Sequence, residues 1–115
     1  MKSLEELKGA VLKFAKDRDW EPFHTPKNLS TAVAVEAAEL QELFMWLTAE
    51  QSTQASPELR AKIEDEVGDV LICLVNFAAS VGIDPLAAAA QKIKKNHEKY
   101  PVDKSRGSAK KYDEY

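Results

Sequence analysis

The sequence lacks most of the features that mark specialised classes of protein. Its single cysteine, Cys73, cannot form an internal disulfide, which agrees with a reducing cytoplasm. The first residues contain no apolar core of the kind that a secretory signal needs, and later apolar runs are too short to span a bilayer. The net charge of −3 gives no general attraction to nucleic acid or to an anionic membrane. We therefore expect a soluble cytoplasmic protein.

The chain is rich in apolar residues at helical spacing. Hydrophobic residues make up 44% of its 115 residues. A chain of this size can bury about two-thirds of its unfolded surface as one domain. Strand signals are lacking, and capping or turn residues separate four predicted helices. Their approximate bounds are 3–19, 28–47, 57–82 and 85–99, and a basic tail follows at 101–115.

These helices predict an all-α fold, namely an antiparallel four-helix bundle in a single domain, 1–115, with a C-terminal tail. The two central helices are apolar on more faces than a bundle of this length can cover. We therefore expect a homodimer or homotetramer to complete the fold.

Two pairs of acidic residues lie inside the most apolar stretches of the chain. Glu36 and Glu39 form one pair, and Glu66 and Asp69 form the other. Residues three apart project from the same face of a helix, so the four carboxylates can face each other across two helices. Isolated pairs of this kind mostly lie on a solvated surface, as we expect for the neighbouring Glu64. Two pairs in apolar surroundings instead favour a shared site.

A divalent cation is the simplest partner for four converging carboxylates, because in an apolar bundle each one loses hydration and repels the others. The donors are all oxygen atoms, with no His or Cys among the four residues. This set suits Mg²⁺, with Mn²⁺ as a second choice, better than zinc or copper. Magnesium held by a few carboxylates keeps positions open for water and phosphates, so the pattern favours phosphoryl chemistry.

The acidic pairs and their flanking segments resemble the all-α nucleoside triphosphate pyrophosphohydrolases of the MazG type, and among them the dCTP pyrophosphatase branch. The family pattern of Glu-x-x-Glu followed by Glu-x-x-Asp matches Glu36, Glu39, Glu66 and Asp69. Further segments that look like this branch are 19–29, 42–46, 69–72 and 110–112, so the resemblance covers nearly the whole chain.

The resemblance implies Mg²⁺-dependent hydrolysis between the α and β phosphates of a deoxynucleoside triphosphate, giving the monophosphate and pyrophosphate, with cleansing of the nucleotide pool as the expected role. The four acids would bind the metal, and Glu39 is our choice for the base. No glycine-rich phosphate loop is present, so positive side chains would have to hold the outer phosphates. The candidates are Lys92, Lys95, Lys110 and Lys111, and for each one a solvated surface position is an equal alternative.

Trp20, His24 and Trp46 are the candidates for a nucleoside pocket. Aromatic faces can stack on a base, and His can donate or accept a hydrogen bond at its edge. Core packing is the alternative for either Trp. Asn96 matches an Asn that contacts substrate in the family, and it shares a helix face with Lys92.

Two positions depart from the mammalian members of that branch, which have a His in the first helix and a Tyr shortly after the second acidic pair. This chain has Val11 and Cys73 there. The smaller side chains would enlarge the pocket, so dATP becomes a candidate substrate beside dCTP. Cys73 is interpreted as a small packing residue, because the surrounding acids disfavour a thiolate.

A different class of function stays open from the residues alone. In a non-enzymatic helical dimerisation or regulatory module, the buried acids would only specify the register of the helices. That alternative predicts no metal dependence, and it gives no reason for Trp20 and His24 to lie close in sequence to the acids.

Overall fold

The structure, a computed structural model, describes residues 1–114, and this range is helical without a strand. The prediction of an all-α fold is confirmed. The chain divides into two compact units, Met1–Gly82 and a second one that begins at Ile83. Tyr115, the last residue of the predicted tail, lies outside the described residues. The prediction of a single domain stays a prediction.

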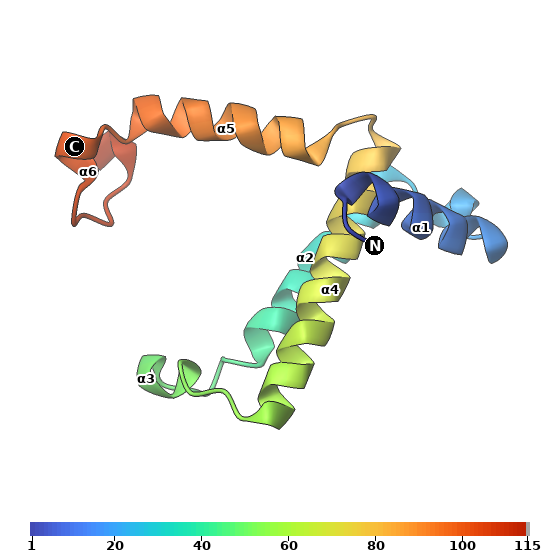
Figure 1. The fold of residues 1–115 in the computed structure, drawn as a ribbon, viewed down its shortest axis with the longest axis horizontal. Coiled ribbons are helices and arrows are strands. Elements are labelled where there is room, and N and C mark those ends of the chain that lie inside the picture. Colours follow the sequence, from blue (N-terminus) through green and yellow to red (C-terminus); the bar gives the residue numbers. More distant parts are fainter. Residues whose placement is uncertain (115) are drawn as a thin grey trace. The chain divides into compact units, whose positions relative to one another are not determined.

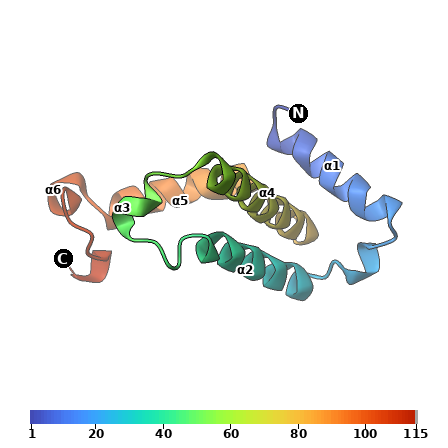
Figure 2. The same ribbon diagram turned by 90° about the horizontal axis from the view of Figure 1, so that it is seen from below.

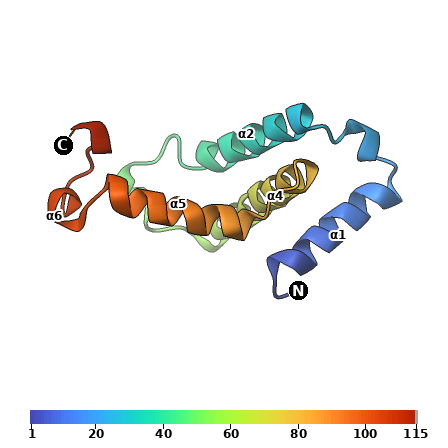
Figure 3. The same ribbon diagram turned by 90° about the horizontal axis from the view of Figure 1, so that it is seen from above.

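The first unit contains three long helices around one small core. Its elements are α1 (Leu4–Asp17), the short helix η1 (Glu21–Phe23), α2 (Pro26–Glu42), α3 (Ala49–Ser52) and α4 (Pro57–Ser80). Helices α2 and α4 lie side by side and run in opposite directions (Figure 1). Seen from below and from above, α4 lies between α1 and α2, which are joined at one end by the segment that contains η1 (Figures 2 and 3). Three of the four predicted long helices therefore pack together.

Side chains just before each long helix of this unit determine where the helix begins. Ser3 accepts a hydrogen bond from the amide of Glu6, and Ser56 accepts one from the amide of Leu59, each at 3.1 Å. Thr25 caps α2 in the same way, followed by a proline at the first helical position. Helix α4 ends just before Gly82, whose φ of 68° suits a residue without a side chain.

The second predicted helix is shorter than expected. We predict it to reach residue 47, but α2 ends at Glu42. The amides of the next three residues, Leu43, Phe44 and Met45, donate to carbonyls three residues back, so the helix tightens into successive turns. The polar connection that follows contains α3, which begins with a capping box formed by Thr48 and Gln51.

The core of this unit is small for three helices. Its buried apolar residues are Val11, Ala15, Leu29, Val75 and Ala78. In contrast, four large apolar residues of α4 stay between 40% and 49% exposed, namely Val67, Leu71, Ile72 and Leu74. The helices therefore leave apolar surface on α4 uncovered.

The second unit contains α5 (Pro85–Lys99), α6 (Val102–Ser105) and the short helix η2 (Tyr112–Glu114). Asp84 caps α5 through its side chain, as the Asp-Pro start predicts. How α5 packs against the other three long helices stays a prediction. Among the described residues, no single helix is long and apolar enough to cross a membrane; α4 and α5 meet that requirement only when they are counted together.

Candidate functional site

Helices α2 and α4 bring three of the four predicted acids together. Glu36 and Glu39 project from one face of α2, and Glu66 projects from α4. One carboxylate oxygen from each of the three lies within 4.8 Å of the others. Such a group of oxygen donors can hold a cation of the hard type, such as Mg²⁺ or Mn²⁺.

This acidic cluster of Glu36, Glu39 and Glu66 is electrostatically strained. A hydrogen bond with Glu39, followed by burial and by the charges of Glu39, Asp69 and Glu66, raises the pKa of Glu36 from 4.5 to about 7. Burial first, and then the charges of Glu39 and Asp69, raises the pKa of Glu66 as well. Each shift means that the carboxylate is less stable here than in water.

Two oxygen atoms of the cluster also lack the partners that buried polar atoms normally have. The Oε2 atoms of Glu36 and Glu66 are buried, and neither has a hydrogen-bond partner. An unpaired buried acceptor is costly, and a bound cation would satisfy both atoms and reverse the repulsion between the carboxylates. The residues present therefore fit a divalent cation.

Asp69 connects the acidic cluster to a cavity. It lies about one turn beyond Glu66 on α4, is exposed, and its charge contributes to the raised pKa of both Glu36 and Glu66. It also lines a cavity of about 470 Å³ that lies between α1, α2 and α4. Trp20 and His24 line the same cavity, which we call the main cavity. The structure thus places these two predicted binding residues in the same cavity as Asp69.

The walls of the main cavity are mostly apolar. Leu7, Val11 and Phe14 come from α1, and Ile72 and Cys73 come from α4. Burial, followed by the charges of Glu36 and Asp69, raises the pKa of the Cys73 thiol, which agrees with a neutral packing residue. A cavity of this size with few polar groups is typical of a site for a small molecule.

Aromatic contacts hold Trp20 and His24 in place. The Trp20 ring meets Phe14 edge to face, with centroids 5.7 Å apart, and meets His24 in the same way at 6.5 Å. The Phe14 ring also contacts Arg18, whose guanidinium carbon lies over the ring, 3.5 Å from its centroid. Trp20 is nevertheless 44% exposed, so its ring is not part of the core.

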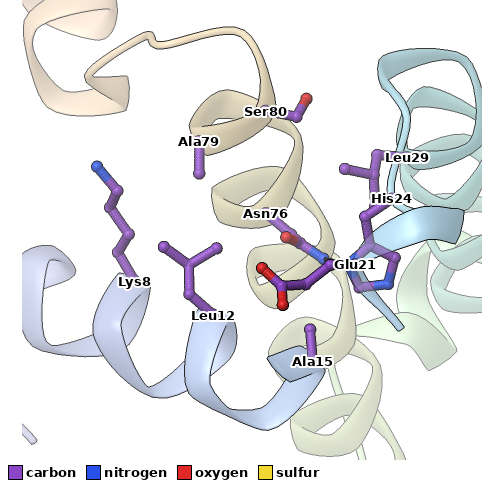
Figure 4. Close-up of a pocket in the computed structure, with 9 residues that line it drawn as sticks. All are labelled: Lys8, Leu12, Ala15, Glu21, His24, Leu29, Asn76, Ala79 and Ser80. Atoms are coloured by element: carbon purple, nitrogen blue, oxygen red, sulfur yellow. Dashed lines mark hydrogen bonds between the residues drawn. The ribbon is translucent and has the colours of Figure 1, made fainter. Parts of the chain in front are cut away.

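Asn76 is a residue of this site that is not among the predicted site residues. It is 9% exposed, and its Nδ2 donates to Nδ1 of His24 across 3.3 Å. Asn76 and His24 line both the main cavity and a second cavity of about 390 Å³ (Figure 4). The sequence does contain one signal, because Asn76 follows Glu66, Asp69 and Cys73 at helical spacing and therefore shares their face of α4.

The remaining predicted residues are not brought to the main cavity by the first unit. Trp46 lies in the turns after α2, is 88% exposed and does not line the main cavity. Lys92, Asn96, Lys110 and Lys111 belong to the second unit. Within that unit, Lys99 and then Lys95 lower the pKa of Lys92, which indicates a concentrated positive charge on α5.

The chain is similar to known proteins. The model of the MazG-like family matches residues 31–115. The chain is 46% identical to the rat (Rattus norvegicus) dCTP pyrophosphatase 1 over 112 residues, which are 96% of this chain and 66% of the relative. It is 42% identical to the human (Homo sapiens) dCTP pyrophosphatase 1 over 114 residues, which are 97% and 67% of the two chains. The chain therefore spans about two-thirds of the length of these relatives.

A solved structure is also similar. It is a crystal structure of a pyrophosphatase from Archaeoglobus fulgidus, with a TM-score of 0.80 and 36% identity. The match covers 84% of this chain and 91% of that one.

Proposed function

Because the chain belongs to the MazG-like family, we propose that it hydrolyses deoxynucleoside triphosphates to the monophosphate and pyrophosphate. The observation that carries the proposal is the acidic cluster, with two unpaired buried oxygens, next to a cavity that begins at Asp69. The names of the rat and human relatives support dCTP as the first substrate. dATP is the second candidate, because Val11 and Cys73 line the main cavity and are smaller than the His and Tyr that the mammalian members have at these positions.

Glu36, Glu39, Glu66 and Asp69 are the residues that would hold Mg²⁺, or Mn²⁺ in its place. When bound, such a cation supplies neutralisation of the triphosphate charge and acidification of a water molecule. The raised pKa values of Glu36 and Glu66 support this choice, because cation binding favours the ionised forms that the bare site disfavours.

The side chains of the site have separate tasks in the proposed reaction. Glu39, the exposed member of the acidic cluster, accepts the proton of the water that attacks the α-phosphorus. The bond between that phosphorus and the bridging oxygen breaks, and pyrophosphate leaves. Trp20 and His24 bind the nucleoside in the main cavity, where the apolar walls exclude water from its faces.

Other residues enter the proposal through the resemblance and through their charge. Trp46 has an exposed ring that can cover a bound base. Lys92, Lys110 and Lys111 would hold the outer phosphates, and Asn96 would contact the substrate. The lysine cluster on α5 supports a phosphate-binding role for Lys92.

Self-association is part of the same proposal. The exposed apolar residues of α4, including Leu71 and Leu74, are too close together to count as single scattered surface residues. We expect them to be buried in a homodimer or homotetramer, and light scattering after gel filtration measures the mass directly. A monomer at micromolar concentration would contradict this part of the proposal.

Product analysis tests the activity. With Mg²⁺ and dCTP in water enriched in ¹⁸O, we expect dCMP and pyrophosphate, with the label in dCMP because attack occurs at the α-phosphorus. A Glu36→Gln variant, purified in parallel, controls for contaminating enzymes. Formation of dCDP and phosphate would contradict the proposal. No turnover of any deoxynucleoside triphosphate, with or without metal, would favour the dimerisation module instead.

A further inference from the structure

Asn76 combines burial with unused hydrogen-bonding groups. It is the buried polar residue of the part of the chain that the structure describes, at 9% exposure. Its amide has two N–H donors and one acceptor oxygen, and the bond to His24 uses one donor. Its oxygen points away from the His24 ring (Figure 4). A buried amide with an available acceptor and donor in a cavity wall is suited to bind a ligand.

The contact with His24 fixes the direction of this amide. In the tautomer of His24 that carries its ring proton on Nε2, Nδ1 is the acceptor for the N–H of Asn76 Nδ2. In this tautomer, turning the amide by half a rotation would place its oxygen against the Nδ1 lone pair. The aromatic contact with Trp20 restrains the His24 ring in turn. With His24 in this tautomer, the positions of donor and acceptor on Asn76 are set before a ligand arrives.

The position of Asn76 along α4 relates it to the acidic cluster. Asp69 and Asn76 line the same cavity and are seven residues apart on one helix, which is a rise of about 10 Å. If the triphosphate is bound at the acids, as the proposed function requires, the sugar and base extend along the main cavity towards Asn76. The walls of this cavity are mostly apolar, with Val11, Phe14 and Ile72 among them. Asn76 is then placed to meet the edge of the base.

We propose that Asn76 is a specificity-determining residue that selects bases carrying an amino group beside a ring nitrogen acceptor. Cytosine presents N4–H and N3 in this order, and adenine presents N6–H and N1. The amide oxygen of Asn76 accepts from the amino group, and its remaining N–H donates to the ring nitrogen, as amides do with adenine in nucleic-acid recognition. Thymine and guanine present a carbonyl beside an N–H, which reverses both positions and leaves buried groups unpaired.

Removing one partner at a time tests the contact. The substrates are dCTP, dATP, dTTP and the triphosphate of a 2-pyrimidinone deoxynucleoside, which is cytosine without its amino group. In the wild type, loss of the amino group should lower kcat/KM by about 10- to 100-fold. In Asn76→Leu, which has a similar size but no hydrogen bonds, the same loss should change kcat/KM by about twofold or less. Equal losses in both proteins would overturn the proposal.

Two further variants separate recognition from folding. Ser80 lies on the same side of α4 and lines the second cavity but not the main cavity. The ratio of kcat/KM for dCTP to kcat/KM for dTTP should therefore be the same in Ser80→Ala as in the wild type. His24→Phe keeps an aromatic ring but removes the hydrogen bond to the Asn76 amide, which is then free to turn. The ratio of kcat/KM for dCTP to kcat/KM for dTTP should fall, mainly because kcat/KM for dTTP rises. A His24→Phe variant that keeps the full ratio would show that His24 does not orient Asn76, and it would overturn the fixed-amide mechanism. Circular dichroism checks that each variant is folded.

Dissociation constants for the same nucleotides distinguish this inference from the proposed function. A wild type that binds dCTP and dATP more tightly than dTTP, but releases no pyrophosphate, would contradict the proposed reaction and support the role of Asn76. A wild type that releases pyrophosphate from dTTP as readily as from dCTP would support the proposed reaction and contradict the role of Asn76. If it neither binds nor hydrolyses any of these nucleotides, both are wrong.

Discussion

The acidic cluster and the main cavity lie along the same helix, yet they differ in how complete they are. At the cluster, Glu36 and Glu66 each have a buried oxygen without a partner and a raised pKa. In the cavity, Asn76 is bonded to His24 and the aromatic rings contact one another. A bound cation would relieve the repulsion at the cluster, whereas the cavity is already formed. We therefore expect ligands and substitutions to affect stability at the first region and selectivity at the second.

The largest effect should come from removing one charge of the acidic group. Asp69→Asn is expected to lower turnover by at least 10²- to 10³-fold, the order of effect seen when a group that stabilises transition-state charge is lost. The stability of the metal-free protein should stay equal or rise, because one repulsive charge is gone. Steady-state pyrophosphate release and thermal melts in EDTA measure the two effects.

A matched control for this substitution is Glu64→Gln, on the same helix. Glu64 is exposed and pairs with Arg60 at 3.4 Å, outside the cluster, so its replacement should leave turnover unchanged. An active Asp69→Asn variant, or one that is clearly destabilised without metal, would break the distinction between the two regions.

The next effect is the stabilisation that the cation provides. At a Mg²⁺ concentration one hundred times its dissociation constant, the wild type should gain about 2.7 kcal/mol. For a chain of this length the gain corresponds to a rise of roughly 10 °C in Tm. Differential scanning calorimetry with EDTA and with excess Mg²⁺ measures it. If the Tm is the same with EDTA and with excess Mg²⁺, even in the presence of a nucleotide analogue, the proposed cation site is wrong.

A smaller effect is expected at the aromatic end. Trp20→Ala should raise KM for dCTP by a factor that corresponds to roughly 1 to 3 kcal/mol of lost stacking, with no change in metal binding. Trp46→Ala is the comparison, because Trp46 is 88% exposed and outside the main cavity. We expect it to raise KM and weaken base selection less than Trp20→Ala does. Unchanged kinetics in the Trp20 variant would show that Trp20 does not stack on the base.

The smallest effect is a dependence of metal-free stability on pH. The pKa of Glu36 is raised from 4.5 to about 7 in the folded state, so the folded protein binds more protons than the unfolded one between these values. This contribution is fully present below pH 4.5 and is lost as the pH rises through 7. Melts in EDTA should therefore show that Glu36→Gln gains Tm relative to wild type as the pH rises from 5 to 8. A constant difference would contradict the raised pKa.

The two regions also differ in how far the sequence predicts them. Spacing alone placed Glu36 and Glu39 on one face, and two apolar helices were enough to bring Glu66 beside them. Helical spacing places Asn76 on the same face as Glu66 and Asp69, but its partner His24 is 52 residues away, and periodicity does not identify contacts between elements. The same limit applies to the end of α2. The segment 43–47 is apolar and has no helix-breaking residue, so only the tertiary structure shows that the helix ends at Glu42.

Calorimetric titration of Mn²⁺ into the nucleotide-free protein at pH 8 tests most directly whether the acidic cluster is a cation site. Wild type and the Glu64→Gln control should bind with the same affinity, and Glu36→Gln and Glu66→Gln should each lose most of it, because both remove an oxygen that the fold leaves unpaired. Binding to Glu36→Gln and Glu66→Gln that equals binding to the wild type would contradict the account, since the ion would then be held elsewhere on the chain.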